Sequence, residues 1–249
     1  MKITIITAVY NSKSTIQQVF DSIKSQNYSD IEHIVIDGDS NDGTQKVIEN
    51  NIQRVAKYIS EKDQGLYDAI NKGIRLATGD IIGILNADDL FYDNETLSRV
   101  ASEFTMNGEL DALYGDVVYF NEQGKITRKY SSKYFSPWMF RFGMEPAHPS
   151  FYCRKEVFAK LGLYAKEYKI SGDFELMLRY IKKNNIRCKY LPFSFVKMRV
   201  GGMSTSGLKN TVKMNKEILK ACRKNGIYTN SFFLYLKYFV KWWGFVFKS

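Results

Sequence analysis

The segment GDIIGILNADDLFY, residues 79–92, joins a buried-strand pattern to two adjacent carboxylates. An apolar run from Ile81 to Leu85 is followed closely by Asp88 and Asp89. Two adjacent like charges repel each other, which raises the pKa of a carboxyl group unless a positive charge lies nearby. Two interpretations are open at this point. One aspartate caps a helix around residues 95–100, or the pair helps to bind a divalent cation through hard oxygen ligands.

The sequence before this segment repeats one order of features: an apolar run, a polar turn and a helical pattern. This alternation predicts a parallel sheet with helices on its faces. Right-handed crossovers then place the carboxyl ends of the strands at one edge, where open α/β sheets bind ligands. The predicted strands span residues 3–9, 33–36, 55–59 and 81–85. A first helix is predicted after Ser12 or Ser14, either of which could cap it. A second helix is predicted near Val47, and a third over residues 66–77.

Polar side chains follow each of these four strands. They are Asn11, the run from Asp37 to Asp42, the run from Glu61 to Asp63, and Asp88 with Asp89. Acidic and amide groups that converge from four separate turns are difficult to explain as four independent helix caps. The pattern therefore favours a ligand site at this edge.

The second half of the chain is less regular. Strands are predicted at 113–120 and 188–200, with a long aromatic loop at 130–142 between them. A helix is predicted at 171–183 with Ser171 as its cap, and a basic helix at 207–226.

Composition limits the class of protein. The chain has 249 residues, which fits one α/β domain with additions or two small domains. Its three cysteines, Cys153, Cys188 and Cys222, form no C-x-x-C pair, which indicates neither a disulfide framework nor a zinc site and suits a reducing cytosol. The first residues enter a strand directly, so we expect no signal peptide. Residues 181–249 hold 15 Lys+Arg and one acid, which gives them a formal net charge of +14. Because the whole chain carries +10, residues 1–180 carry −4.

The motifs together resemble the inverting GT-A glycosyltransferases of family 2, in the subtype that assembles colanic acid, O-antigen and capsule. The resemblance covers about residues 1–205 and implies a Rossmann-like, mostly parallel central sheet with helices on both faces, followed by C-terminal helices. Its motifs are TAVYN (7–11), DGDSNDGT (37–44), DQG (63–65), NKG (71–73), NADD (86–89) and SGD (171–173).

The resemblance implies how a nucleotide-sugar donor is held. Thr7, Val9, Asn11, Asp37 and Asp39 would line the nucleoside site, with Asp39 accepting hydrogen bonds from a uracil edge. For Asp42, Gly43 and Thr44 a tight turn with a helix cap is an equally ordinary explanation.

Further donor contacts follow from the same resemblance. Asp63, Asp68 and Lys72 would lie near the donor, although Asp68, Lys72 and Arg75 also fit a solvated salt ladder on one helix face. Asn86 and Asp88 would contact the ribose or the donor sugar. Arg199 and Ser204, in the loop RVGGMST, would reach the diphosphate, unless that loop is a plain glycine turn.

Metal and catalytic roles are also implied. Asp89 would bind Mg²⁺ or Mn²⁺, which neutralises charge developing on the leaving phosphate. Asp173 matches the catalytic base of an inverting transfer, but the preceding residue is Gly172 where relatives carry Glu. The alternative is that Asp173 is a first-turn acid favoured by the helix dipole. His148 is an acceptor-side candidate, since the resemblance places this segment near the acceptor; a metal ligand and a structural histidine are the alternatives.

The last segment, NSFFLYLKYFVKWWGFVFKS (230–249), predicts a membrane-associated helix. On a helical wheel its lysines fall in one narrow sector opposite the aromatic side chains, and lysines at its middle argue against a membrane-spanning helix. Such a helix suits an anionic membrane surface, while packing on the protein or in a homodimer is the alternative. The segregation of lysine from aromatic residues argues against nucleic acid. We therefore expect residues 1–205 to form the GT-A domain and residues 206–249 a membrane-association region.

The sequence thus predicts a metal-dependent inverting glycosyltransferase that uses a nucleotide-sugar, in particular a UDP-sugar. The acceptor would be a polyprenyl-diphosphate-linked lipid or a glycan in surface polysaccharide synthesis. The location would be cytoplasmic, peripheral on the inner face of the cell membrane. The alternatives are a non-catalytic nucleotide-sugar-binding subunit and a sugar-nucleotide pyrophosphorylase, for which YNSKST (10–15) is a poor triphosphate loop.

Overall fold

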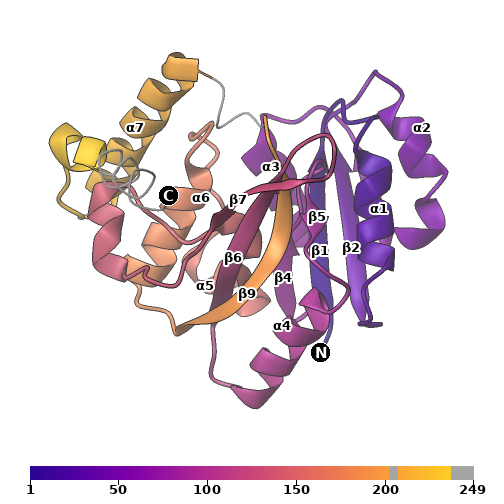
Figure 1. Cartoon of the computed structure of the whole chain (residues 1–249), viewed down its shortest axis with the longest axis horizontal. Coiled ribbons are helices and arrows are strands. Elements are labelled where there is room, and N and C mark those ends of the chain that lie inside the picture. Colours follow the sequence, from indigo (N-terminus) through magenta and orange to yellow (C-terminus); the bar gives the residue numbers. More distant parts are fainter. Residues whose placement is uncertain (202–206, 237–249) are drawn as a thin grey trace.

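A computed structural model of the chain describes residues 1–201 and 207–236 and shows one mixed sheet covered by helices (Figure 1). The strand order is β3-β2-β1-β4-β8-β6-β9-β5, and β7 pairs with β6. This confirms the predicted α/β class, but the sheet is mixed rather than mostly parallel: among the described residues four strand pairings are parallel and four are antiparallel. The strands are β1 (Ile3–Val9), β2 (Ile31–Asp37), β3 (Lys57–Ser60), β4 (Ile81–Ile84), β5 (Leu90–Phe91), β6 (Ala112–Phe120), β7 (Ile126–Tyr130), β8 (Tyr152–Arg154) and β9 (Cys188–Arg199).

The first four strands are parallel and in a register that brings their ends together. Val9 of β1 lies opposite Asp37 of β2, and Asp37 lies opposite Ser60 of β3. On the other side of β1, Ile6 lies opposite Ile84 of β4. The four polar turns therefore meet at one edge of the sheet, as the sequence predicts.

The second half of the sheet contains three strands that were not predicted. β8 is antiparallel to both β4 and β6, and β5 is antiparallel to β9. β5 and β8 are two and three residues long. Strands this short carry no readable alternation, and only their neighbours stabilise them.

Helices pack on both faces of the sheet. Side chains of β1 alternate between two cores: Ile5 packs with α1, α2 and α4, whereas Ile6 packs with α3, α5, α6 and α7. The helices are α1 (Ile16–Lys24), α2 (Thr44–Glu49), α3 (Leu66–Leu76), α4 (Thr96–Met106), α5 (Lys155–Leu161), α6 (Gly172–Met177) and α7 (Gly207–Lys224). Shorter turns are η1 (Ile52–Arg54), η2 (Pro137–Phe142), η3 (His148–Ser150) and the π-helix η4 (Leu178–Lys183).

Several local predictions differ from the structure. Neither Asp88 nor Asp89 caps a helix, because α4 begins at Thr96 and the carboxylate of Asp93 accepts the Glu95 N–H at 3.0 Å. The predicted helix at 171–183 is α6 followed by a π-helical turn. Ser171 holds the N-cap position of α6 without a side-chain capping bond.

Two further local features also differ. The predicted aromatic loop contains the 3₁₀ turn η2. The N-cap position of α1 is Thr15, where the sequence suggested Ser12 or Ser14.

Within the described ranges, no helix is both long enough and apolar enough to cross a bilayer. Ser204 and the aromatic residues 237–249 lie outside the described residues, so the predictions for them are not addressed. In α7, Ile218, Ala221 and Cys222 are buried in the same core as α3 and α6. The division of the chain at residue 205 stays a prediction.

Candidate active site

The turns after β1 and β2 are locked together by short polar side chains. Asn11 has a left-handed φ of 47°, and its Oδ1 accepts the N–H of Asn41 at 3.0 Å. Ser40 Oγ accepts the Asn11 N–H at 2.8 Å and donates to Asp37. The two loops therefore form one rigid rim at the edge of the sheet.

Asp37 organises this rim from inside. Its side chain is fully buried, and its Oδ2 accepts hydrogen bonds from Ser60 Oγ at 2.6 Å and from Gln45 Nε2 at 3.2 Å. Asp39, two residues later, is exposed and has a left-handed φ of 64°. Asp37 thus fixes the backbone that presents the exposed Asp39.

Asp63 joins the same rim from the turn after β3. The N–H of Gly65 donates to its Oδ1 at 2.7 Å. A Cβ placed on Gly38 would lie 2.6 Å from Asp63 Oδ2 and 3.3 Å from the ring of Tyr10. Gly38 is therefore required for the close approach of the Asp63 carboxylate to the turn after β2.

Thr7 and Val9 lie in β1 with buried side chains. Thr7 Oγ1 is 3.1 Å from His33 Nε2, inside the sheet layer. The carbonyl of Val9 accepts the N–H of Gly38 at 2.9 Å. Both residues contribute to the rim through the strand and its backbone, and their predicted contact with the nucleoside stays a prediction.

The structural interpretation of Asp42, Gly43 and Thr44 is confirmed. Gly43 has a φ of 98°, which favours glycine, and it is the N-cap position of α2. Asp42 Oδ1 accepts the N–H of Thr44 at 2.9 Å, and Asp42 Oδ2 accepts the N–H of Lys13 at 3.1 Å. These residues close the turn and start the helix.

Asp68 is not part of a solvated ladder, because its side chain is only 12 % exposed. It accepts the N–H of Gln64 at 3.1 Å and pairs with Lys166 at 3.2 Å, while Lys72 lies 3.9 Å away. Burial raises the pKa of Asp68, but these donors outweigh that effect and hold its pKa below the ordinary value. Lys72 also pairs with Glu61 at 2.7 Å, which links α3 to the turn after β3.

Asp88 and Asp89 lie directly after β4. Asp89 is 2 % exposed and accepts a hydrogen bond from Asn86 Nδ2 at 2.8 Å. Burial and the neighbouring Asp88 raise the pKa of Asp89 to about 7, although Asn86, His148 and the Arg199 backbone partly offset this. Burial also raises the pKa of Asp88, with Arg199 opposing. A buried and a half-buried carboxylate, both with raised pKa values, form a site that a cation would stabilise.

Asp173 lies at the start of α6 and is paired with His148. Asp173 Oδ2 is 2.9 Å from His148 Nδ1, and Asp173 Oδ1 accepts bonds from Tyr67 Oη at 3.2 Å and from the Phe174 N–H at 2.9 Å. Burial raises the pKa of Asp173, but His148 outweighs this and lowers it. Burial lowers the pKa of His148, yet Asp173, Glu145 and Asp89 together raise it to about 9. The structure therefore connects His148 electrostatically to both predicted functional aspartates.

Tyr67 is a site residue that the sequence did not reveal. Its hydroxyl donates to the Ile170 carbonyl at 2.8 Å as well as approaching Asp173, and its ring stacks on Tyr164 at 5.5 Å. A Cβ at Gly172 would lie 2.6 Å from the Tyr67 ring. The glycine that departs from the family pattern is thus the residue that makes room for Tyr67. In the sequence, only this glycine could have indicated that a large side chain packs beside Asp173. Tyr67 itself lies among the buried residues of α3, where an aromatic side chain is ordinary.

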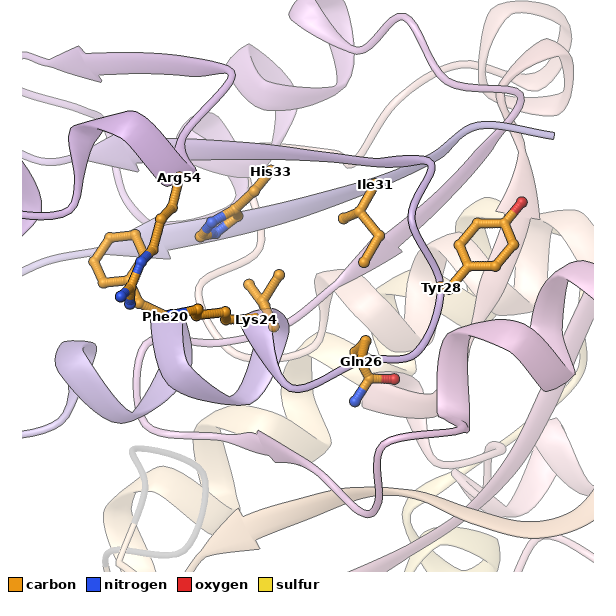
Figure 2. A pocket seen from close by; sticks show the side chains of 8 residues that line it. Phe20, Lys24, Gln26, Tyr28, Ile31, His33 and Arg54 are labelled. Atoms are coloured by element: carbon orange, nitrogen blue, oxygen red, sulfur yellow. The ribbon is translucent and has the colours of Figure 1, made fainter.

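A cavity of about 200 Å³ lies elsewhere, between α1 and β2 (Figure 2). Its lining residues are Phe20, Ile23, Lys24, Gln26, Tyr28, Ile31, His33 and Arg54, none of which is a predicted site residue. Among the predicted site residues, Asp39, Asp63, Asp88 and Asp89 instead lie in the turns that follow β2, β3 and β4.

The residues present fit a bound Mg²⁺ or Mn²⁺. Asp89 offers a buried carboxylate whose pKa is raised by burial and then by the charge of the neighbouring Asp88. Within residues 1–201 and 207–236, no three His, Cys, Asp or Glu side chains are close enough to form a complete metal cage. Magnesium-type sites at phosphates need only one or two protein carboxylates, because phosphate and water oxygens complete the shell.

Comparisons with known proteins agree with this geometry. Residues 4–162 match the sequence profile of glycosyl transferase family 2, and the chain belongs to that family. Its arrangement of sheet and helices is the GT-A fold. The resemblance of the motifs is confirmed at the level of family and fold.

Two kinds of relative are informative. A PGL/p-HBAD biosynthesis glycosyltransferase of Mycobacterium bovis is 29% identical over 220 residues, covering 87% of this chain and 82% of the relative. S. aureus TarS 1–349, solved in complex with UDP-GlcNAc, superposes with a TM-score of 0.68 at 17% identity, covering 89% of this chain and 66% of TarS 1–349.

A mannosyltransferase from Pyrobaculum calidifontis, solved with GDP-Man and Mn²⁺, superposes with a TM-score of 0.67 at 17% identity. This match covers 90% of this chain and 63% of the mannosyltransferase. The chain therefore spans less than two thirds of the length of these solved chains, and the likeness at this identity shows the fold.

Proposed function

We propose that the chain transfers a sugar from a UDP-sugar to an acceptor hydroxyl with inversion, using Mg²⁺ or Mn²⁺. The acceptor would be a polyprenyl-diphosphate-linked lipid or a glycan in surface polysaccharide synthesis, at the inner face of the cell membrane. The observation that carries this proposal is the arrangement of Asp89, His148 and Asp173. His148 pairs with Asp173 at 2.9 Å, and the charge of Asp89 also raises the pKa of His148.

The rim formed by the turns after β1, β2 and β3 would hold the nucleoside. The exposed Asp39 can accept the N3–H hydrogen bond of a uracil edge, and the ring of Tyr10, which is 63% exposed, offers a stacking surface. Asp63 lies against the same turn. TarS is solved with UDP-GlcNAc and the archaeal mannosyltransferase with GDP-Man, so this fold accepts either base and the choice of uracil depends on Asp39.

The diphosphate would lie over the ends of β4 and β9. Asp89 would hold the metal ion, Asp88 the ribose or the donor sugar, and Arg199 would approach the phosphates from β9. When bound, the ion neutralises the charge that develops on the departing diphosphate. The buried position of Asp89 excludes water from this interaction and strengthens it.

Asp173 would act as the general base. Its lowered pKa keeps it ionised at neutral pH, so it can accept the proton of the acceptor hydroxyl. As that O–H bond breaks, the acceptor oxygen forms a bond to the anomeric carbon, and the bond from that carbon to the diphosphate oxygen breaks. The electron pair leaves with UDP, and attack from the opposite face inverts the anomeric centre. Tyr67 and His148 hold the two carboxylate oxygens in position.

A panel of nucleotide-sugars incubated with the purified protein, with and without Mn²⁺, tests this proposal. We expect metal-dependent release of UDP from one donor, and a product of opposite anomeric configuration in the proton NMR spectrum once the acceptor is supplied. Donor binding without any turnover would instead favour a non-catalytic subunit. Formation of a UDP-sugar from UTP and a sugar phosphate would indicate a pyrophosphorylase.

A further inference from the structure

An exposed group of aromatic side chains lies just before η2, on η2 and on residues 228–233. Tyr134 is 80% exposed, Trp138 is 56% exposed, and Tyr228 and Phe232 are each 68% exposed. Large apolar side chains that gather on the surface of a soluble protein mark an interaction site. We call this group the aromatic face; its members are Tyr134, Trp138, Phe142, Tyr228, Phe232 and Phe233.

Ring contacts connect the members of the aromatic face other than Tyr134, and they join two segments that are distant in sequence. The ring of Trp138 lies 5.5 Å from that of Phe142, and Phe142 lies 5.2 Å from Phe233. Phe233 in turn contacts Tyr228 at 6.1 Å. Thr229 Oγ1 donates to the Arg141 carbonyl, which fastens the two segments together. In Figure 1 both segments lie at the same end of the molecule as α7.

Buried contacts hold the aromatic face rigidly. Phe140, in the middle of η2, is fully buried, and its ring packs against Phe135 at 5.1 Å and against Phe174 at 5.5 Å. Because the exposed rings are carried by an anchored element, they present a preformed surface.

Two cations lie against rings of the aromatic face, and the basic helix α7 lies at the same end of the molecule (Figure 1). The Lys133 ammonium lies 5.3 Å from the Tyr134 ring centroid, and the Arg141 guanidinium lies 5.4 Å from that of Phe233. Residues 207–236 hold six Lys+Arg and one acid, Glu217, whose carboxylate accepts the backbone N–H groups of residues 169–171. The exposed cations of α7 are Lys209, Lys213, Lys216, Lys220, Arg223 and Lys224.

We infer that the aromatic face docks onto an anionic lipid bilayer. Aromatic side chains interleaved with lysine and arginine match the interfacial layer of a membrane, where rings bury and cations meet lipid phosphates. The cores of protein–protein interfaces are instead depleted of lysine. The sequence continues from Leu236 as KYFVKWWGFVFKS, which has the same aromatic and basic composition.

Docking through this face would orient the active site toward the membrane. Phe174, against which Phe140 packs, directly follows the predicted base Asp173. The chain leaving η2 at Phe142 reaches His148 within a few residues. The base and the acceptor-side histidine are thus built on the layer that supports the aromatic face. This orientation rests on the proposed function, because it assumes a membrane-embedded acceptor.

Trp138 fluorescence in the full chain measures the docking directly. In a Trp242→Phe, Trp243→Phe variant, Trp138 is the one remaining tryptophan. With vesicles of phosphatidylcholine and phosphatidylglycerol, we expect its emission to shift to shorter wavelength and to be quenched by brominated lipids. Vesicles of phosphatidylcholine alone should produce little change, because the lysines and arginine then lack a partner.

Substitutions on the same face provide a second measurement. We expect Trp138→Ser or Phe232→Ser each to weaken vesicle binding about tenfold, since each removes one buried ring. Phe193→Ser is the matched control, because Phe193 is 42% exposed on β9, outside the aromatic face. Donor hydrolysis without lipid should be unchanged in Phe232→Ser, so failure of docking and failure of the proposed chemistry are distinguishable.

Three outcomes would overturn this inference. Vesicle binding with unchanged Trp138 emission would show that other residues contact the lipid. Emission that is already at short wavelength without lipid, and insensitive to it, would show that residues 237–249 cover the face. A dimer that Phe232→Ser dissociates, with vesicle binding intact, would show that a second copy of the chain covers it.

Discussion

The close packing of Gly172 against Tyr67 makes Gly172→Ala the most informative single substitution. The added Cβ would lie 2.6 Å from Cε2, 2.7 Å from Cζ and 2.8 Å from Cδ2 of Tyr67. Because carbon atoms in contact are normally separated by about 3.5–4 Å, the ring has to move by roughly 1 Å. Tyr67 has little freedom to move, since it stacks on Tyr164 and donates to the Ile170 carbonyl.

Two consequences follow from this displacement. Overpacking of this kind costs about 1–3 kcal/mol in the free energy of unfolding. The Asp173 carboxylate, which Tyr67 Oη contacts at 3.2 Å, would shift with the ring or the start of α6. A shift of about 1 Å in a catalytic group can lower the rate about a hundredfold. We therefore expect Gly172→Ala to lower kcat much more than it weakens binding of UDP.

Urea unfolding and donor turnover measure the two effects, and Gly108→Ala is the control. A Cβ at Gly108 would meet no atom within 4 Å, so that variant should keep wild-type activity and change stability by less than about 0.5 kcal/mol. In a Tyr67→Leu variant the added Cβ no longer meets an aromatic ring. The loss in the free energy of unfolding caused by Gly172→Ala should then be smaller by about 1 kcal/mol or more. Wild-type kcat and stability in Gly172→Ala, or costs that simply add in the double variant, would refute this reasoning.

Three further predictions follow from the described contacts. Burial lowers the pKa of His33 to about 3, so the unfolded chain takes up a proton first as the pH falls below about 6.5. Urea unfolding should show stability decreasing from pH 6.5 toward pH 3 by up to about 1.4 kcal/mol per pH unit, and His33→Gln should flatten that slope. Gly38→Ala should weaken UDP binding in calorimetry without changing metal binding, because its Cβ would displace the Asp63 carboxylate. Asp42→Ala should lower stability in chemical denaturation, because the N–H of Thr44 at the start of α2 loses its acceptor.

Much of the parallel half of the sheet could be predicted because its signals are local. β1 and β4 are apolar runs that end in polar turns, and α3 shows its buried stripe in the spacing of its residues. The meeting of four strand ends followed from topology alone. The local sequence pattern and the order of the strands were therefore sufficient to predict which edge of the sheet holds the candidate site.

Contacts between distant segments could not be predicted in the same way. The pairing of His148 with Asp173 and the approach of Tyr67 to Asp173 depend on tertiary packing. The aromatic face requires η2 to lie beside residues 228–233, which no sequence period reveals. Asp37 looked like a ligand from its motif, yet its carboxylate is enclosed by Ser40, Gln45 and Ser60.

Our central proposal is that Asp89 binds the metal ion and Asp173 acts as the general base. Comparing UDP binding with donor turnover in two variants tests it most directly. With Mn²⁺ present, Asp89→Asn should lose metal-dependent UDP binding by calorimetry. Asp173→Asn should bind UDP and Mn²⁺ as the wild type does while its transfer rate falls by about 10²–10⁴-fold, the usual contribution of a general base. Transfer at the wild-type rate by Asp173→Asn, or unchanged metal-dependent UDP binding by Asp89→Asn, would contradict the assignment.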